Sequence, residues 1–271
     1  MAKVERKGLN IRLQLLKIVL ACYVPLVENL RSFMMIGGLF SIIYMIVNFF
    51  SGQSLMCANG KFIDNSYCFS NIYIWGLANI LSWFVFCVYI RNWLQCVIMK
   101  KDKFSIKKIL PNKTDLRLFV FVLFIFATIT VAFISGFFLF YRNPNPDYRI
   151  ELLYFSFVSL GFFVPIIGIQ FISYIPIIAE GSPLPKPKEI WKKISGQRGF
   201  VIMSILSVLL ISFLILSSGL NYFSQIAEVG GFFAIVIADF LYNIMLMMFA
   251  TIFANYCYMQ RNILFERNEN V

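Results

Sequence analysis

The side chain best placed to do chemistry is Asp239, the only one of the thirteen acidic residues that lies well inside an apolar stretch. Asn243 follows one helical turn later on the same face, and Asn48 and Asn79 lie inside two other apolar stretches. An ionisable group at that depth in a membrane is a candidate for function. Two hypotheses fit Asp239: it takes part in a proton or cation relay, or it is a protonated carboxyl that is hydrogen-bonded within a helix bundle. These four residues form the candidate intramembrane polar site.

The chain contains no histidine, which excludes His-dependent hydrolases and His-ligated zinc sites in their usual form. The sequence also has no Gly-x-Ser-x-Gly nucleophile elbow, Walker phosphate loop, Gly-x-Gly-x-x-Gly fingerprint or Cys-x-x-Cys pair. Most of its carboxylates fall at the edges of loops instead of converging. We therefore expect no enzymatic activity, no catalytic residues, no cofactor and no bound metal.

Clustered basic residues are the second feature with binding capacity, because each Lys or Arg near an anionic leaflet contributes about 1 kcal/mol of attraction. The formal net charge is +11, and its concentration beside apolar stretches favours a membrane surface over nucleic acid. We expect anionic lipid headgroups as partners and can name no protein partner. The candidate lipid-contacting residues are Arg31, Lys100, Lys101, Lys103, Lys107, Lys108, Lys113, Arg117, Lys192, Lys193 and Arg198.

Cys57 and Cys68 are the two cysteines that fall in the connection between the first two apolar stretches, whereas the other four lie in or near the apolar stretches or on the basic side. If that connection faces an oxidising space, the pair could form a disulfide that closes a short loop. Two thiols are the alternative, because spacing alone does not fix connectivity.

The elements that must position these residues are apolar helices. Hydrophobic residues make up 60% of the chain and charged residues only 14%, which is far from the balance of a soluble protein. The apolar residues fall into six blocks of about 20, the length that a helix needs to cross a bilayer. The sequence therefore predicts one all-α membrane domain over residues 1–271. The predicted spans are 32–52, 72–91, 118–141, 152–178, 200–219 and 231–256.

The distribution of charge predicts the orientation of these spans. Six of the 24 Lys and Arg residues lie in residues 1–31, eight in 91–117, five in 180–199 and two in the C-terminal tail, whereas only Lys61, Arg142 and Arg149 fall on the opposite side. Basic loops stay on the cytoplasmic side of a membrane. We therefore expect a multi-pass protein of the cell inner membrane with both termini in the cytoplasm.

Amphipathic segments on the basic side are expected to lie in the headgroup plane or to pack under the bundle. Residues 9–31 place apolar side chains at steps of three and four, and Pro25 should kink or divide this helix. Residues 183–199 carry a similar short helix around Trp191.

An internal repeat is a further prediction from the same layout. The first, third and fifth spans each begin with the pattern Arg-x-Phe, which predicts three hairpin units in one orientation, at residues 9–92, 100–178 and 184–258. Chance is the alternative, because the chain contains 31 phenylalanines.

Two stretches and the amphipathic segment before the first span resemble a known group of proteins. The stretches are NWLQCVIMKKDKFSIKKILPNKTDLRLFVF (residues 92–121) and ISYIPIIAEGSPLPKPKEIWKKISGQRGF (residues 172–200). In layout the chain is similar to the YciC-like and glycerophosphodiesterase-membrane-domain-like superfamily of six-span bacterial inner-membrane proteins. The resemblance covers most of the chain and implies fold and location, but it carries no catalytic residues.

The sequence thus favours a non-enzymatic inner-membrane protein with a role in membrane or envelope organisation and with contact to anionic lipid. The alternative is a small transporter or channel subunit that uses Asp239. A polar cavity at mid-membrane depth would favour the alternative, and a solid core would favour the organising role.

Overall fold

The structure is a computed structural model of the full chain, and it describes residues 2–50, 72–101, 104–124, 172–194 and 198–265. Every secondary-structure element within these ranges is a helix. Residues 113–124 are also helical. The other elements are α1 (Ala2–Glu28), α2 (Leu30–Phe50), α5 (Ile72–Trp93), the π-helix η1 (Leu94–Ile98), the 3₁₀-helix η2 (Ile106–Ile109), α8 (Tyr174–Glu180), α9 (Pro187–Ile194), α10 (Arg198–Val229) and α11 (Phe232–Phe265).

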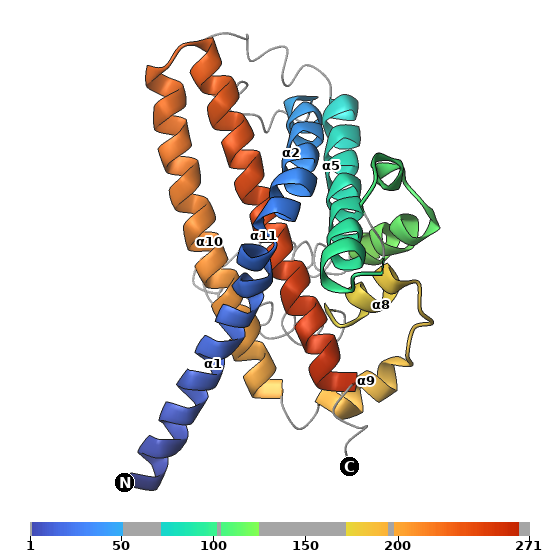
Figure 1. Cartoon of the computed structure of the whole chain (residues 1–271), viewed down its shortest axis with the longest axis vertical. Helices are drawn as coiled ribbons and strands as arrows, with labels where there is room; N and C mark the ends of the chain where they lie inside the picture. Colours follow the sequence, from blue (N-terminus) through green and yellow to red (C-terminus); the bar gives the residue numbers. More distant parts are fainter. Residues whose placement is uncertain (1, 51–71, 102–103, 125–171, 195–197, 266–271) are drawn as a thin grey trace, which may run out of the picture.

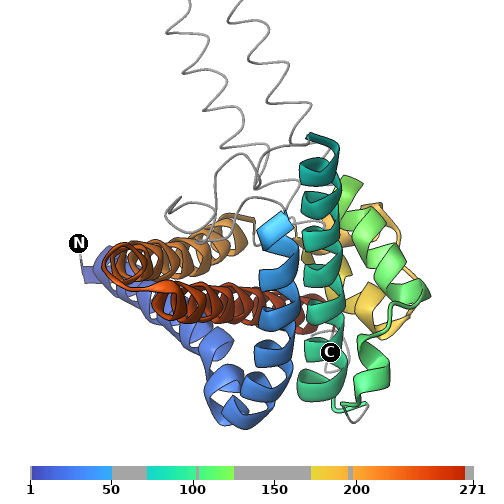
Figure 2. The ribbon, with the colours of Figure 1, turned by 90° about the horizontal axis from the view of Figure 1, so that it is seen from above.

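The long helices pack as two crossing pairs (Figure 1). Helices α10 and α11 form a hairpin, and α2 lies beside α5. Viewed from above, α2 and α5 run across α11 (Figure 2), and both contact it. Helix α1 packs against α10 and α11 and extends away from the bundle toward its N-terminus. Helix α11 is therefore the common partner of α1, α2, α5, α8 and α10.

Three of the described helices are long and apolar enough to cross a membrane, over Leu30–Phe49, Gly76–Ile98 and Phe232–Asn262. They correspond to the first, second and sixth predicted spans and suggest a membrane-embedded chain. The fifth predicted span lies within α10, which is helical over its whole length. Residues 125–171, which hold most of the third and fourth predicted spans, lie outside the described residues. Six crossings and the hairpin repeat therefore stay predictions.

Two of these helices continue beyond the ends that were predicted from apolar length. The second span was predicted to end at residue 91, but the chain stays helical through η1 because Trp93 and Leu94 are fully buried. The last span was predicted to end at residue 256, and α11 continues to Phe265. In this additional length, the Gln260 amide donates a hydrogen bond to the Tyr256 hydroxyl, and Arg261 pairs with Glu180 of α8.

The predicted amphipathic helix before the first span also differs in its limits and in its packing face. It forms α1, and the break before α2 falls at Asn29, which bonds the Pro25 carbonyl through both its backbone N–H and its side chain. The residues of α1 that pack inward are Ile18, Cys22 and Leu26, spaced four apart. The apolar stripe predicted from the steps of three and four comprised Leu9, Leu13, Leu16, Leu20, Tyr23, Val27 and Leu30. Of these, Leu16, Leu20, Val27 and Leu30 are exposed, whereas Tyr23 is half-buried and packs against the core, and the side chains of Leu9 and Leu13 lie outside the described residues. A lipid-facing stripe can be as apolar as a core face, so composition did not distinguish them.

The turn between α10 and α11 requires glycine at one position. A Cβ on Gly230 would lie 2.2 Å from the Ala234 Cβ and 2.9 Å from the Ile226 carbonyl oxygen. A Cβ on the neighbouring Gly231 would meet nothing within 4 Å. The two glycines therefore form a matched pair for testing the hairpin.

We predict that Gly230→Ala destabilises the purified protein by about 1–3 kcal/mol through overpacking, whereas Gly231→Ala changes stability much less. The measurement is thermal unfolding in detergent of both variants and the wild type. Equal unfolding temperatures for the two variants would contradict this geometry of the hairpin.

Candidate functional site

One face of α11 carries a row of buried polar side chains. Asp239, Asn243, Thr251 and Asn255 are each at most 4% exposed, and Met247 fills the remaining step of the row. A spacing of four residues places all five positions on one stripe of a helix. This stripe faces the helices that cross α11, so its polar groups meet those of other helices. We call it the α11 polar ladder.

Asn48 joins three helices at one end of this ladder. Its amide nitrogen donates to the Asn243 side-chain oxygen at 3.1 Å, and its own oxygen accepts from the Ser82 hydroxyl at 3.2 Å. Asn243 in turn donates to the Asp239 backbone carbonyl at 2.7 Å, and its nitrogen lies 3.5 Å from one carboxylate oxygen of Asp239. Asn48, Ser82, Asn243 and Asp239 are all at most 3% exposed. Helices α2, α5 and α11 are therefore connected through one hydrogen-bonded cluster.

The structure thus brings three of the four predicted polar residues into direct contact. The fourth, Asn79, is half-buried on α5, three residues before Ser82. Ser82, which completes the cluster, was not among the predicted site residues. Its position one turn from Asn79 was the available signal, but its bond to Asn48 depends on how α2 and α5 lie against each other.

The other end of the ladder connects α11 to α5 and α1. The Tyr89 hydroxyl bonds Thr251, and the Trp93 indole N–H donates to the Asn255 side-chain oxygen at 2.8 Å. The Asn255 amide then donates to the Cys22 backbone carbonyl on α1 at 2.7 Å. Sequence reasoning missed Asn255, because it lies beside the predicted end of the last span and there looked like a terminal polar residue.

This arrangement is chemically suited to holding helices together. Each amide of Asn48, Asn243 and Asn255 both donates and accepts a hydrogen bond, so these three buried amides are satisfied within the bundle. Two cavities of about 470 and 710 Å³ lie elsewhere in the described residues, and neither is lined by a ladder residue. Among the described residues, no group of three Cys, Asp or Glu side chains is placed to hold a metal ion.

A second polar region lies at the ends of the helices where the basic residues gather, and its first part is a helix cap. The Asn112 side-chain oxygen accepts from the backbone N–H groups of Thr114 and Asp115, and Asp115 accepts from the Asn112 N–H at 2.8 Å. This reciprocal capping box begins the 113–124 helix. Asp115 also forms a buried ion pair with Arg91, at 2.7 Å from its Nε. Burial raises the pKa of Asp115, which Asn112 and Arg91 oppose.

Glu180 is the second anchor of this region. It lies at the end of α8 and pairs with Lys101 at 2.6 Å and with Arg261 of α11 at 2.7 Å. Gln95 of η1 also donates to the Ala179 carbonyl at 2.6 Å. Gly181, with a φ of 80°, ends α8 in the left-handed conformation that favours glycine. Three segments far apart in the sequence thus meet at Glu180.

These anchors position the candidate lipid-contacting residues. The exposed ones are Arg31, Lys100, Lys101, Lys107, Lys113, Arg117 and Lys192. Lys103 lies outside the described residues, as do the side chains of Lys108, Lys193 and Arg198. Cys57 and Cys68 also fall outside them, so their disulfide stays a prediction.

We predict that Asn48→Ala and Asn243→Ala each destabilise the protein by about 1–3 kcal/mol, because each leaves a buried partner unsatisfied. Their double-mutant cycle should give a coupling energy of about 0.6–1.7 kcal/mol, the range found for hydrogen bonds between membrane helices. Unfolding in detergent measures both. The control cycle pairs Asn48→Ala with Ser212→Ala, which removes a bond to Tyr23 on α1. Additive effects for Asn48 and Asn243 would show that the bond contributes nothing.

We also predict a pH-dependent contribution from Glu180. The hydrogen bond from Lys101 lowers the pKa of Glu180 below its ordinary value of 4.5, with help from Arg261 and against partial burial. The ionised carboxylate therefore stabilises the fold above pH 4.5, and this contribution is lost as the pH falls through the lowered pKa.

Glu180→Gln should accordingly lower stability near pH 7 by about 0.2–1 kcal/mol and should match the wild type near pH 3. The matched control is Glu189→Gln, which removes an exposed carboxylate on α9. Thermal unfolding in detergent at the two pH values provides the comparison. A Glu180→Gln deficit that is as large near pH 3 as near pH 7 would contradict the assignment.

Comparison of the chain with known protein families, with curated proteins and with solved structures gives no match. The likeness to the YciC-like superfamily therefore stays a prediction from the sequence.

Proposed function

We propose that the chain is a non-enzymatic inner-membrane protein that contacts anionic lipid and acts in membrane or envelope organisation. The observation that carries this proposal is an exposed set of cations beside three apolar helices. These cations are Arg31, Lys100, Lys107, Lys113, Arg117 and Lys192, which we call the basic surface. Phosphate headgroups are the nearest anions to residues at the end of a membrane helix.

The segment over residues 94–112, which joins α5 to the 113–124 helix and which we call the basic connection, is anchored to the bundle, and this supports the proposal. Arg91 pairs with Asp115 and Lys101 pairs with Glu180, and both pairs attach the connection to the bundle. The exposed lysines are thus carried by a segment held at several points, instead of by a freely moving loop. A held array of cations loses less side-chain and backbone entropy on binding than a loose one.

The proposal includes the orientation that the charges predict. The basic surface lies on the cytoplasmic side, six spans cross the inner membrane, and both termini are cytoplasmic. In this arrangement the protein would have the layout of the bacterial YciC-like superfamily. The hydrogen bonds between the α11 polar ladder and its neighbouring helices support a solid core among the described helices, which suits an organising protein.

Spin-labelled lipids test the proposal in the full-length protein reconstituted into bilayers. We predict that an anionic phosphatidylglycerol probe associates with the protein more strongly than a phosphatidylcholine probe, and that salt removes the difference. The triple variant Lys107→Gln, Lys113→Gln, Lys192→Gln should lose about 1 kcal/mol of this preference per charge. The measurement is the motionally restricted fraction in electron paramagnetic resonance.

A triple variant with Lys→Arg at the same positions keeps the charges and should keep the preference. Equal association of the two probes with the wild type, or a preference that salt does not change, would show that the charges serve only to set topology. The proposed lipid contact would then be wrong.

A transporter or channel subunit is the second candidate, and the observation that favours it is the buried carboxyl of Asp239 beside Asn243. If Asp239 only packs, the Asp239→Asn variant should reach normal membrane levels and should rescue the phenotype of a knockout strain, because the amide keeps the shape and polarity of the side chain. Failure of Asp239→Asn to rescue at normal membrane levels, with rescue by wild type, would favour ion coupling.

A further inference from the structure

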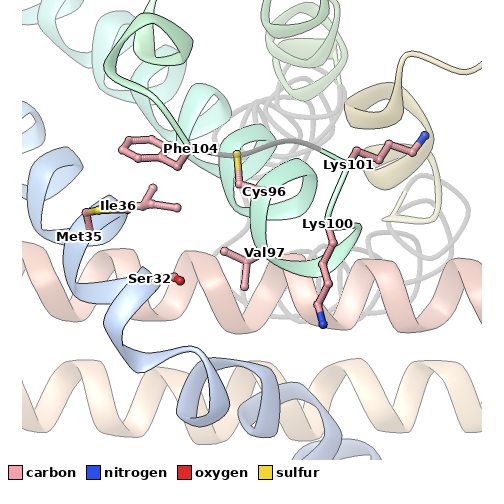
Figure 3. Close-up of a pocket in the computed structure, with 8 residues that line it drawn as sticks. All are labelled: Ser32, Met35, Ile36, Cys96, Val97, Lys100, Lys101 and Phe104. Carbon is pink, nitrogen blue, oxygen red and sulfur yellow. The ribbon is translucent and has the colours of Figure 1, made fainter.

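A cavity of about 470 Å³ lies between the beginning of α2 and η1 (Figure 3). We call it the α2–η1 cavity. Its volume falls in the range of about 300–1,000 Å³ that is typical of small-molecule sites. It is lined by Ser32, Met35, Ile36, Cys96, Val97, Lys100, Lys101 and Phe104.

The lining divides into an apolar wall and a polar rim. Met35, Ile36 and Phe104 come from opposite sides of the cavity and approach one another in Figure 3. Ser32 lies one turn before Ile36 on α2, and Lys100 follows η1 at the rim. Such a division fits a ligand that has a hydrocarbon part and an anionic part.

Lys100 is held at the rim in an unusual backbone conformation. Its φ of 51° is the one positive φ among the described residues other than glycine. The bonds on either side of it fix this turn, from the Met99 N–H to the Leu94 carbonyl and from the Lys101 N–H to the Gln95 carbonyl. Left-handed residues other than glycine carry strain and gather at ligand sites.

The two neighbouring lysines differ in what they bind. Lys101 turns toward α8 and pairs with Glu180 (Figure 3). Lys100 points in another direction (Figure 3), and the ion pairs between described residues do not include it. Its ammonium is therefore the cation at the rim that can accept an external anion.

We propose that the α2–η1 cavity binds one anionic phospholipid, with the headgroup phosphate at Lys100 and Ser32 and an acyl chain against Met35, Ile36 and Phe104. The proposal rests on the proposed function, and it adds a single defined site to a diffuse surface attraction. A lipid is favoured over a soluble phosphate because the wall is apolar and because Met34 and Met35 beside it are each 54% exposed on a membrane-length helix. A soluble anion would leave that wall unused.

The Cys96 thiol in the lining provides a reporter. The test uses the full chain with Cys96 as its single cysteine, placed in lipid nanodiscs, and measures the rate of maleimide reaction. We expect the reaction to be about fivefold slower in nanodiscs with phosphatidylglycerol than in pure phosphatidylcholine, which is the effect of one cation near an anionic headgroup. Lys100→Gln should remove the difference, and Lys100→Arg should keep it.

Two further arms identify the source of the anion and the residue that binds it. Inorganic phosphate added to phosphatidylcholine nanodiscs should leave the rate unchanged, and protection by it would overturn the lipid assignment in favour of a free-phosphate site. The triple variant Lys107→Gln, Lys113→Gln, Lys192→Gln should keep the protection, because those lysines do not line the cavity. Equal rates in both lipids, or equal loss in Lys100→Gln and the triple variant, would also overturn the proposal.

A second measurement keeps the test valid if removal of the other five cysteines prevents folding. Phospholipid retained by the detergent-purified protein with its native cysteines is counted by native mass spectrometry. We expect one retained phosphatidylglycerol in the wild type and the triple variant and none in Lys100→Gln. Retention that Lys100→Gln does not change would contradict the site. If spin-labelled lipids show no surface preference but Lys100 still controls retention, only the proposed surface function fails.

Discussion

The structure depends on one constraint: a polar side chain inside hydrocarbon must find its hydrogen-bond partner within the protein. Helix α11 places its polar groups four residues apart, and three of them bond other helices: Asn243 bonds α2, Thr251 bonds α5, and Asn255 bonds α5 and α1. Lipid supplies no hydrophobic drive for helix association, so these bonds and close packing must select the arrangement. The ladder therefore determines which face of each helix turns inward.

Neutral polar side chains and ion pairs lie in different regions of this protein, each where its burial costs the least free energy. Apart from Asp239, the ladder consists of neutral amides and hydroxyls, whose burial is compensated by ordinary hydrogen bonds. Ion pairs gather instead at the helix ends, where Glu180 remains partly exposed to solvent. Arg91 and Asp115 are the buried exception, and the capping box at Asn112 supplies the additional bonds that a buried carboxylate needs.

The sequence predicted what depends on local spacing and left open what depends on how distant segments meet. Three apolar helices could be found from length, and the contact between Asp239 and Asn243 follows from their four-residue step. The partners of Asn48 could not be found, because Asn48 and Asn243 are 195 residues apart in the chain. The inward face of α1 was missed because lipid-facing and core-facing stripes are equally apolar. Most of residues 118–178 and both Cys57 and Cys68 lie outside the described residues, so those predictions are unchanged.

In the basic connection, the number of lysines alone does not predict the role of each one. In sequence, Lys100 and Lys101 are equivalent members of one cluster, and both qualify as lipid contacts. In the structure, Lys101 pairs with Glu180. The backbone hydrogen bonds from Met99 to Leu94 and from Lys101 to Gln95 hold Lys100 in the left-handed conformation. Lys101 is therefore part of the scaffold, whereas Lys100 lines the α2–η1 cavity. The distinction is created by Glu180, which is 79 residues away and belongs to another helix. Two lysines that are equivalent in the sequence therefore differ in the structure because the fold brings Glu180 to one of them.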